Sequence, residues 1–167
     1  KYNKIVHSSS KSSIVPISEY NMANLMMEIN DLSAAERHFK HIIKLYPTSD
    51  YAVASEYFLG LIEITDLPES ENKKQKTIEK AGIHFKNYIE KSPSGRYAIK
   101  SLEELLKFNL KFNNYDNLLI SKVYYENGEF DKAKEFLNKT TLAVLFRRNI
   151  SLFPLIERKI SILKRIS

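Results

Sequence analysis

Three histidines are the first residues whose type and spacing could do chemistry. His38 and His41 lie three residues apart, which puts both side chains on one face of a predicted helix, and His84 takes the place of His38 in a related segment. A metal such as zinc would need one or two further ligands on that face. Only Glu36 lies nearby, and it points elsewhere. We interpret these histidines as structural or surface residues and predict no metal site and no cofactor.

Other catalytic arrangements are also missing from the sequence. Glu103 and Glu104 are adjacent, so their carboxylates diverge around a helix, which is poor geometry for paired acid–base work. The four glycines are scattered and form neither a phosphate-binding loop nor a Gly-x-Ser-x-Gly elbow. The absence of Cys excludes disulfides, thiolate zinc sites and a Cys nucleophile. We predict no catalytic residues and a protein that is not an enzyme.

A segmental repeat indicates how the chain is organised. Residues 35–52 and 81–98 align without gaps, and eight of the eighteen positions are identical. The identical pairs are Ala35/Ala81, His38/His84, Phe39/Phe85, Lys40/Lys86, Ile43/Ile89, Pro47/Pro93, Tyr51/Tyr97 and Ala52/Ala98. A period of this size is typical of stacked helical hairpins. Each copy reads as the second helix of a hairpin, a proline that stops it, and the start of the next helix.

The apolar spacing predicts an all-α chain. We expect helices over residues 18–30, 32–45, 52–64, 76–91, 96–127 (one long helix, bent near 113–114), 129–147 and 153–166. Leu59-Gly60 should allow close helix contact, and Gly128 should supply a left-handed helix cap. The polar segment 65–75 reads as an elongated loop. No apolar run is long enough to span a membrane.

The length of 167 residues fits one domain. We interpret residues 1–18, with six Ser and no acidic residue, as a flexible N-terminal tether. Residues 19–167 are then a single domain. Its expected parts are repeats over residues 19–50, 51–95 and 96–148 and a terminal basic helix over residues 152–166.

The net charge of +6 is carried by the C-terminal end. Residues 1–138 hold 19 basic and 19 acidic side chains, whereas residues 139–167 hold seven basic ones against Glu157 alone. The predicted basic docking face consists of Arg147, Arg148, Arg158, Lys159, Lys164 and Arg165. It reads as the solvated face of a capping helix, a docking face for an acidic partner or anionic lipid, or a nucleic-acid site. Because most of the ten Tyr and nine Phe fit repeat packing, we expect no nucleic-acid partner.

Several spacings resemble the tetratricopeptide consensus. The matching residues are Ala35, Phe39 and Pro47, then Leu59-Gly60, then Ala81, Phe85 and Pro93, and finally Tyr124, Gly128, Phe130 and Ala133. The resemblance implies a tetratricopeptide-like helical-hairpin solenoid of about three divergent repeats plus a C-terminal helix.

A narrower resemblance covers residues 20–137. The segments YPTSDYAVASEYFLGL, HFKNYIEKSPSGRYAIKSLEELL and LLISKVYYENGEFDKAKEFL are similar, in order and spacing, to the BamD family. These are tetratricopeptide-like lipoproteins of the outer-membrane β-barrel assembly machinery, and this chain resembles a short form. The resemblance implies a scaffold subunit that binds the barrel insertase, other assembly subunits or unfolded outer-membrane proteins. It also implies a location at the periplasmic face of the outer membrane, held by a lipidated Cys upstream of Lys1.

Other functions remain open beside this one. The main alternative is a generic tetratricopeptide protein–protein interaction adaptor, cytoplasmic or periplasmic, with another partner. A third is an RNA-binding helical repeat that uses the basic end. If the consensus register holds, the concave groove of such an array is lined by Tyr20, Asn24, Tyr57, Leu61 and Lys122, which would suit an extended peptide.

Overall fold

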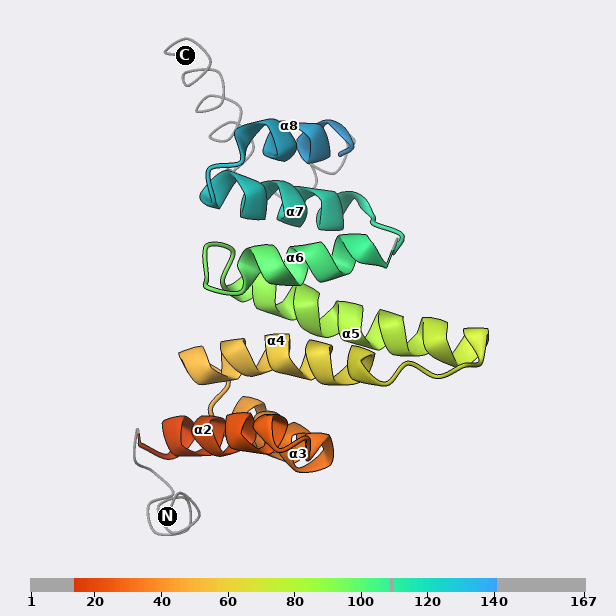
Figure 1. The fold of residues 1–167 in the computed structure, drawn as a ribbon. Coiled ribbons are helices and arrows are strands. Elements are labelled where there is room, and N and C mark those ends of the chain that lie inside the picture. Colours follow the sequence, from red (N-terminus) through yellow and green to blue (C-terminus); the bar gives the residue numbers. More distant parts are fainter. Residues whose placement is uncertain (1–13, 109, 141–167) are drawn as a thin grey trace. The chain divides into compact units, whose positions relative to one another are not determined.

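The computed structural model describes residues 14–108 and 110–140, and these residues form seven helices and no strand (Figure 1). The helices are α2 (Ile14–Glu28), α3 (Leu32–Leu45), α4 (Asp50–Thr65), α5 (Glu71–Lys91), α6 (Ala98–Lys107), α7 (Asn114–Glu126) and α8 (Phe130–Asn138). The all-α prediction of tetratricopeptide-like helical hairpins is confirmed over this part of the chain. None of the described helices is both long and apolar enough to cross a membrane.

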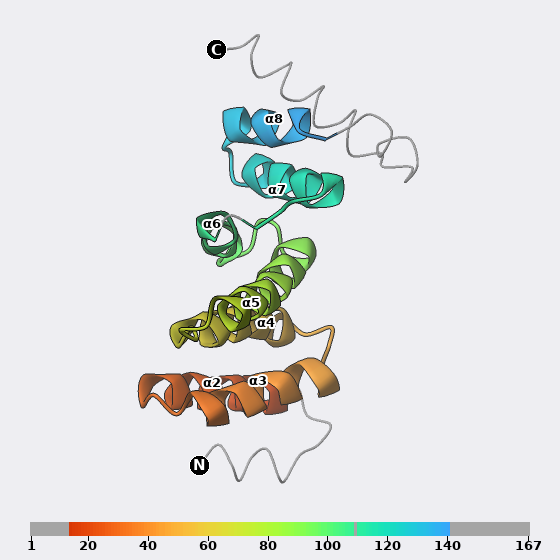
Figure 2. The same ribbon diagram turned by 90° about the vertical axis from the view of Figure 1, so that its right-hand side faces the viewer.

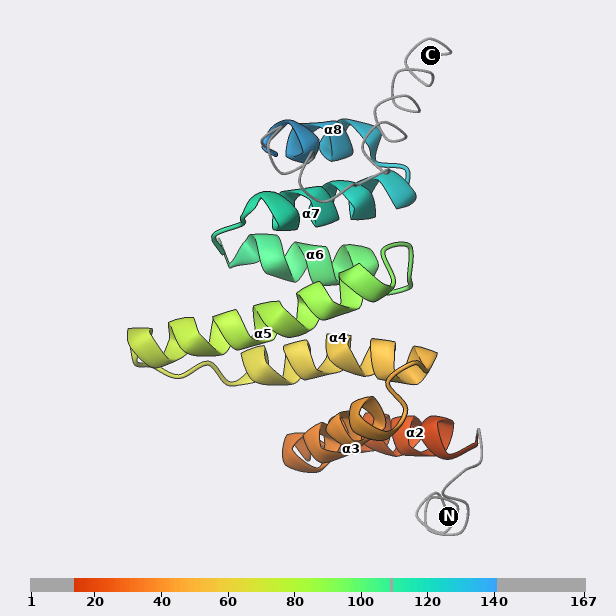
Figure 3. The ribbon, with the colours of Figure 1, turned by 180° about the vertical axis from the view of Figure 1, so that it is seen from behind.

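Contacts between Cα atoms divide the chain into two compact units, residues 1–92 and 93–167. The first unit contains two hairpins, α2–α3 and α4–α5. The second contains α6 and the hairpin α7–α8, whose helices lie side by side in all three views (Figures 1–3). The predicted single domain over residues 19–167 and its three repeat boundaries stay predictions.

The core of the first unit forms where three helices meet. Side chains of α2, α3 and α4 that are 0–1 % exposed make one cluster: Ala23, Ala35, Phe39, Ile42, Ala52 and Leu59. The ring of Phe39 stacks on that of Phe58 from α4, with centroids 5.3 Å apart and planes 6° from parallel. Small residues beside large rings therefore set how closely these helices approach.

Polar caps determine where α3 and α4 begin. The side chain of Asp31 accepts a hydrogen bond from the backbone N of Ala34, and Ser49 accepts one from Ala52. Asn30 supplies the left-handed turn before α3, with φ of 61°. The predicted helix over residues 32–45 is confirmed, because α3 is Leu32–Leu45.

Three helices of the first unit begin earlier than predicted, α4 by two residues and α2 and α5 by more. The tether prediction is wrong for residues 14–18, because α2 begins at Ile14 and buries Val15 to 2 % exposure. Likewise α5 begins at Glu71, so the loop before it is shorter than residues 65–75. The serine content of the N-terminal segment suggested a tether in the first case, and the polarity of residues 65–75 suggested a loop in the second. One buried face is enough to form the start of α2, and the first turn of α5 is a polar, solvated turn.

The long helix predicted over residues 96–127 is wrong. The structure ends α6 at Lys107 and starts α7 at Asn114. Asn113 forms a capping box, accepting from the N–H of Asp116 while the Asp116 carboxylate accepts from the N–H of Asn113. A capped helix start replaces the predicted bend.

Helix α8 is shorter than expected. Helix α8 ends at Asn138, so a helix continuing to residue 147 is wrong. Gly128 has φ of 82°, which confirms the predicted left-handed position. The terminal helix predicted over residues 152–166 lies outside the described residues.

Candidate functional site

The two hairpins of the first unit are built from equivalent residues. Ser18-Glu19-Tyr20 in α2 and Ser55-Glu56-Tyr57 in α4 are identical triplets 37 residues apart. The second helices repeat at 46 residues, as Phe39 and Phe85 show. The period of 37 residues in the first helices differs from that of 46 in the second helices, so the sequence repeat over residues 35–52 and 81–98 does not extend to them.

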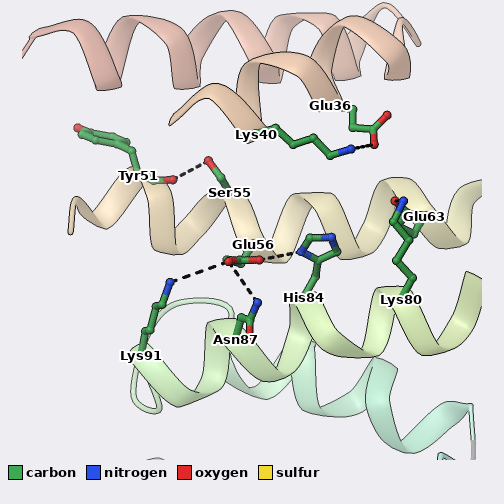
Figure 4. A network of polar contacts seen from close by, with 10 residues as sticks. All are labelled: Glu36, Lys40, Tyr51, Ser55, Glu56, Glu63, Lys80, His84, Asn87 and Lys91. Atoms are coloured by element: carbon green, nitrogen blue, oxygen red, sulfur yellow. Dashed lines mark hydrogen bonds and ion pairs between the residues drawn. The ribbon is translucent and has the colours of Figure 1, made fainter. Parts of the chain in front are cut away.

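Each hairpin buries a carboxylate of its first helix against a histidine of its second. Glu19 is 1 % exposed, and Nδ1 of His41 lies 2.7 Å from both of its oxygens, the distance of a hydrogen bond in which the ring N–H donates. Glu56 is 4 % exposed, and Nδ1 of His84 lies 2.7 Å from its Oε2 (Figure 4). An unpaired buried carboxylate is costly, so each histidine stabilises its hairpin.

The second pair has two further partners. The amide of Asn87 donates to Glu56 at 3.3 Å, and the ammonium of Lys91 lies 3.9 Å from it (Figure 4). Asn87 is also the repeat equivalent of His41. Both hairpins thus use the position of His41 and Asn87 to bond the carboxylate, and the second hairpin adds His84.

Two further ion pairs lie near these carboxylate–histidine pairs. Glu36 contacts Lys40 at 2.5 Å on its own helix, and this hydrogen bond lowers the pKa of Glu36 although burial opposes it. Lys80 of α5 pairs with Glu63 of α4 (Figure 4). Burial lowers the pKa of His38, although the charge of Glu19 acts in the opposite direction. Across the described chain, no three potential metal ligands come together.

The first two groove residues predicted from sequence lie one turn apart on α2. The Tyr20 ring packs against the rings of Phe39 (6.0 Å), Tyr51 (5.3 Å) and Phe58 (5.9 Å). The Asn24 amide donates to the Tyr20 carbonyl at 2.9 Å within the same helix. Tyr20 therefore joins α2 to α3 and α4, and both residues are half-buried.

The next two groove residues lie on α4, and the last lies on α7. Tyr57 is 8 % exposed and packs against Phe85 and Tyr88, whereas Leu61 is half-buried. Lys122 is half-buried and belongs to the second unit. Peptide binding by these residues stays a prediction. All six residues of the predicted basic docking face lie outside the described residues.

The α7–α8 hairpin of the second unit has an uncharged residue at the position of the buried carboxylate. Asn117 stands in α7 where Glu19 and Glu56 stand in the first helices, four residues before the small buried residue, here Ser121. The Ser121 hydroxyl donates to the carbonyl of Ala133 at 2.8 Å across the hairpin. Phe136 stands at the position of His38 and His84, and Lys139 at that of His41, so the carboxylate and the imidazoles are lost together.

A cavity of about 360 Å³ lies in the second unit. Its lining consists of Ile99, Leu102, Glu103, Tyr124, Asn127, Glu129 and Lys132. Lys132 pairs with Glu129 at 3.3 Å and lies 5.4 Å from the centroid of the Tyr124 ring. Burial raises the pKa of Tyr124. This chain's own ammonium therefore already occupies the aromatic face that could receive a cation.

Residues 18–49 match the family model of the tetratricopeptide repeat. The match covers most of α2 and all of α3, the hairpin that holds the Glu19–His41 pair. The chain is tetratricopeptide-like. No curated protein and no solved structure matches the chain. Repeats of this kind are typical of protein–protein interaction and of non-enzymatic adaptors.

Proposed function

We propose that this chain is a non-enzymatic adaptor that holds other proteins on its helical hairpins. The observation that carries the proposal is the repeated construction of α2–α3 and α4–α5, with the same Ser-Glu-Tyr triplet, a small buried residue and a buried aromatic ring at equivalent positions. Hairpins repeated in this way form a rigid scaffold whose outer residues are free to vary for binding.

The specific role we propose is that of a scaffold subunit in outer-membrane β-barrel assembly. It would bind the insertase, other assembly subunits or unfolded barrel proteins at the periplasmic face, with a lipid anchor upstream. The support is the similarity of residues 20–137 to the BamD family in order and spacing. The tetratricopeptide match fits this role and the generic adaptor equally well.

A pull-down separates the two roles. The tagged full-length precursor product would be purified from detergent-solubilised cell envelopes, and the co-purifying proteins identified by mass spectrometry. Near-stoichiometric recovery of the barrel insertase is expected for the assembly role. Enrichment of a different protein would contradict that role and leave the generic adaptor, and recovery of no protein would contradict both. An untagged strain is the control.

The predicted groove has its own test. Asn24→Ala and Leu61→Ala remove half-buried side chains without opening the core, so the fold should survive. Weaker binding of the partner recovered in the pull-down is expected from both variants. The matched control is Lys40→Ala on α3, an exposed residue outside the predicted groove. Unchanged binding by both groove variants would show that the groove assignment is wrong.

A further inference from the structure

We infer that the cavity of the second unit is a binding site for an arginine side chain of a partner protein. Its volume of about 360 Å³ is at the low end of the roughly 300–1,000 Å³ of ligand sites, which suits one long side chain rather than a whole helix. Its lining comes from α6, α7, α8 and the turn between the last two, all within one compact unit. The inference rests on the proposed adaptor role and gives that role a particular contact.

The two most buried lining residues form the floor of the cavity. Leu102 is 1 % exposed and Tyr124 is 9 % exposed. The Tyr124 ring contacts Phe136 and Lys132, but its hydroxyl forms no hydrogen bond with any residue that the structure describes. Burial raises the pKa of this hydroxyl, so it keeps its proton at neutral pH. A side chain that is nine-tenths buried thus offers the cavity a hydroxyl that still lacks a partner.

The exposed lining residues form a rim that offers hydrogen-bond acceptors. The Glu103 carboxylate of α6 forms no hydrogen bond or ion pair with the described residues. The side-chain amide of Asn127, at the end of α7, donates to two backbone carbonyls, so its oxygen remains as an acceptor. Glu129, just before α8, adds a second carboxylate. Apart from Lys132, the polar side chains of the rim therefore accept hydrogen bonds.

Charge and hydrogen-bond capacity select a cation as the occupant. The lining holds two carboxylates and one ammonium, so its net charge is −1. An anion would be attracted by Lys132 alone, which already pairs with Glu129 at 3.3 Å, and would be repelled by Glu103. A guanidinium has five N–H donors in a planar fork and no acceptor, so it serves separate acceptors better than the compact ammonium of lysine. Its aliphatic stem can lie along Ile99 and Leu102.

Lys132 competes with this occupant without excluding it. Its ammonium lies 5.4 Å from the centroid of the Tyr124 ring, so an incoming guanidinium meets Tyr124 at the hydroxyl and not at the ring face. The Lys132 side chain is 57 % exposed, and an exposed ion pair contributes little to stability, so this side chain can move aside. Removal of the Glu103 charge should therefore weaken arginine binding, whereas removal of the Lys132 charge should strengthen it.

An NMR titration of the full chain with N-acetyl-arginine amide tests the site. We expect the backbone amide signals of Ile99, Leu102 and Tyr124 to shift, with the millimolar affinity that one side chain supplies. N-acetyl-citrulline amide has the same shape without the charge and should cause no such shifts. N-acetyl-lysine amide has the charge without the planar fork and should bind several-fold more weakly.

Two pairs of variants test the charges separately. Glu103→Gln should weaken binding of the arginine derivative about fivefold, and Lys132→Gln should strengthen it about threefold. The matched controls are Glu126→Gln and Lys134→Gln, which make the same charge changes at exposed positions outside the cavity. Both controls should leave the affinity unchanged. Melting curves followed by circular dichroism check that all four variants fold.

Four results would overturn the inference: no shifts at the cavity, equal shifts with the arginine and citrulline derivatives, unchanged binding by Glu103→Gln, or weaker binding by Lys132→Gln. In the pull-down, Glu103→Gln should also recover less of the partner than Glu126→Gln does. Equal recovery by these two variants would assign the partner to another surface and leave the adaptor role. A wild-type pull-down without any partner would contradict the adaptor role itself, while the titration decides separately whether the cavity binds arginine.

Discussion

A Cβ atom added to Gly60 would lie 2.6 Å from Cε1 of Phe85, with two further atoms of that ring within 2.9 Å. Real Cβ atoms essentially never approach this closely, and Phe85 is only 1 % exposed. The contact between α4 and α5 therefore depends on glycine at this position. The sequence prediction of close helix contact at Leu59-Gly60 is confirmed for Gly60.

Gly60→Ala should destabilise the first unit. Alanine favours a helix over glycine by about 1 kcal/mol, but overpacking a core typically costs about 1–3 kcal/mol, so we expect a net loss. Chemical denaturation followed by circular dichroism measures it. Phe85→Leu in the same chain should recover part of the loss, since the smaller side chain makes room. An unchanged or raised unfolding free energy for Gly60→Ala alone would mean that the helices separate without cost.

Phe39→Ala should be among the most damaging single substitutions. Phe39 is fully buried and contacts rings from α2 and α4, and large-to-small core changes of this kind cost about 3–5 kcal/mol. The measurement is a denaturant titration. Leu45→Ala, on the same helix but 49 % exposed, is the control and should change stability by less than about 0.5 kcal/mol. Similar losses for both variants would contradict the packing described for α3.

His84→Ala should destabilise the second hairpin because it leaves the buried Glu56 carboxylate with weaker partners. Loss of a partner from a buried polar group costs about 1–3 kcal/mol, and Asn87 and Lys91 should keep the value within this range. Glu56→Gln combined with His84→Ala should cost less than the sum of the single changes, as the neutral Asn117 of the second unit suggests. Strict additivity in this double-mutant cycle would show that the two side chains do not interact.

Acidification should weaken the fold through His38. Burial lowers the pKa of His38 in the folded protein, so the unfolded chain binds this proton more readily. The associated stability is present above the ordinary histidine pKa near 6.5 and is lost as the pH falls through the lower, folded value. Melting temperatures at pH 7.5 and 5.5 measure the effect. His38→Asn should show a smaller decrease on acidification, and an equal or larger decrease would assign the pH dependence to other groups.

The sequence was sufficient where a local cap and a repeated apolar pattern agreed. Asp31 and Pro47 flank α3, whose predicted bounds were therefore right. The sequence was insufficient where the start of a helix depends on one polar side chain. Asn113 begins α7 without any proline or glycine nearby, and the continuous apolar spacing concealed the break.

The buried carboxylates were missed for a different reason. Glutamate in a helix usually faces solvent, so Glu19 and Glu56 gave no reason to expect burial. The Ser-Glu-Tyr triplet that they share was the available signal, but its period of 37 residues differs from the period of 46. The spatial pairing of Glu19 with His41 and of Glu56 with His84 shows that the two first helices are equivalent.

The difference between those two periods has a consequence for how this array can change. Ala23 and Ala35 are separated by twelve positions, as are Ser121 and Ala133, whereas Gly60 and Ala81 are separated by twenty-one. The nine added residues lie at the far end of the second hairpin, where α5 extends past the Thr65 end of α4 (Figures 1 and 3). At this end of the α4–α5 hairpin, the helices can therefore differ in length without a change in the packing of the core. The hairpin tip can gain or lose whole helical turns, and with them new surface, while every pairing in the core keeps its register.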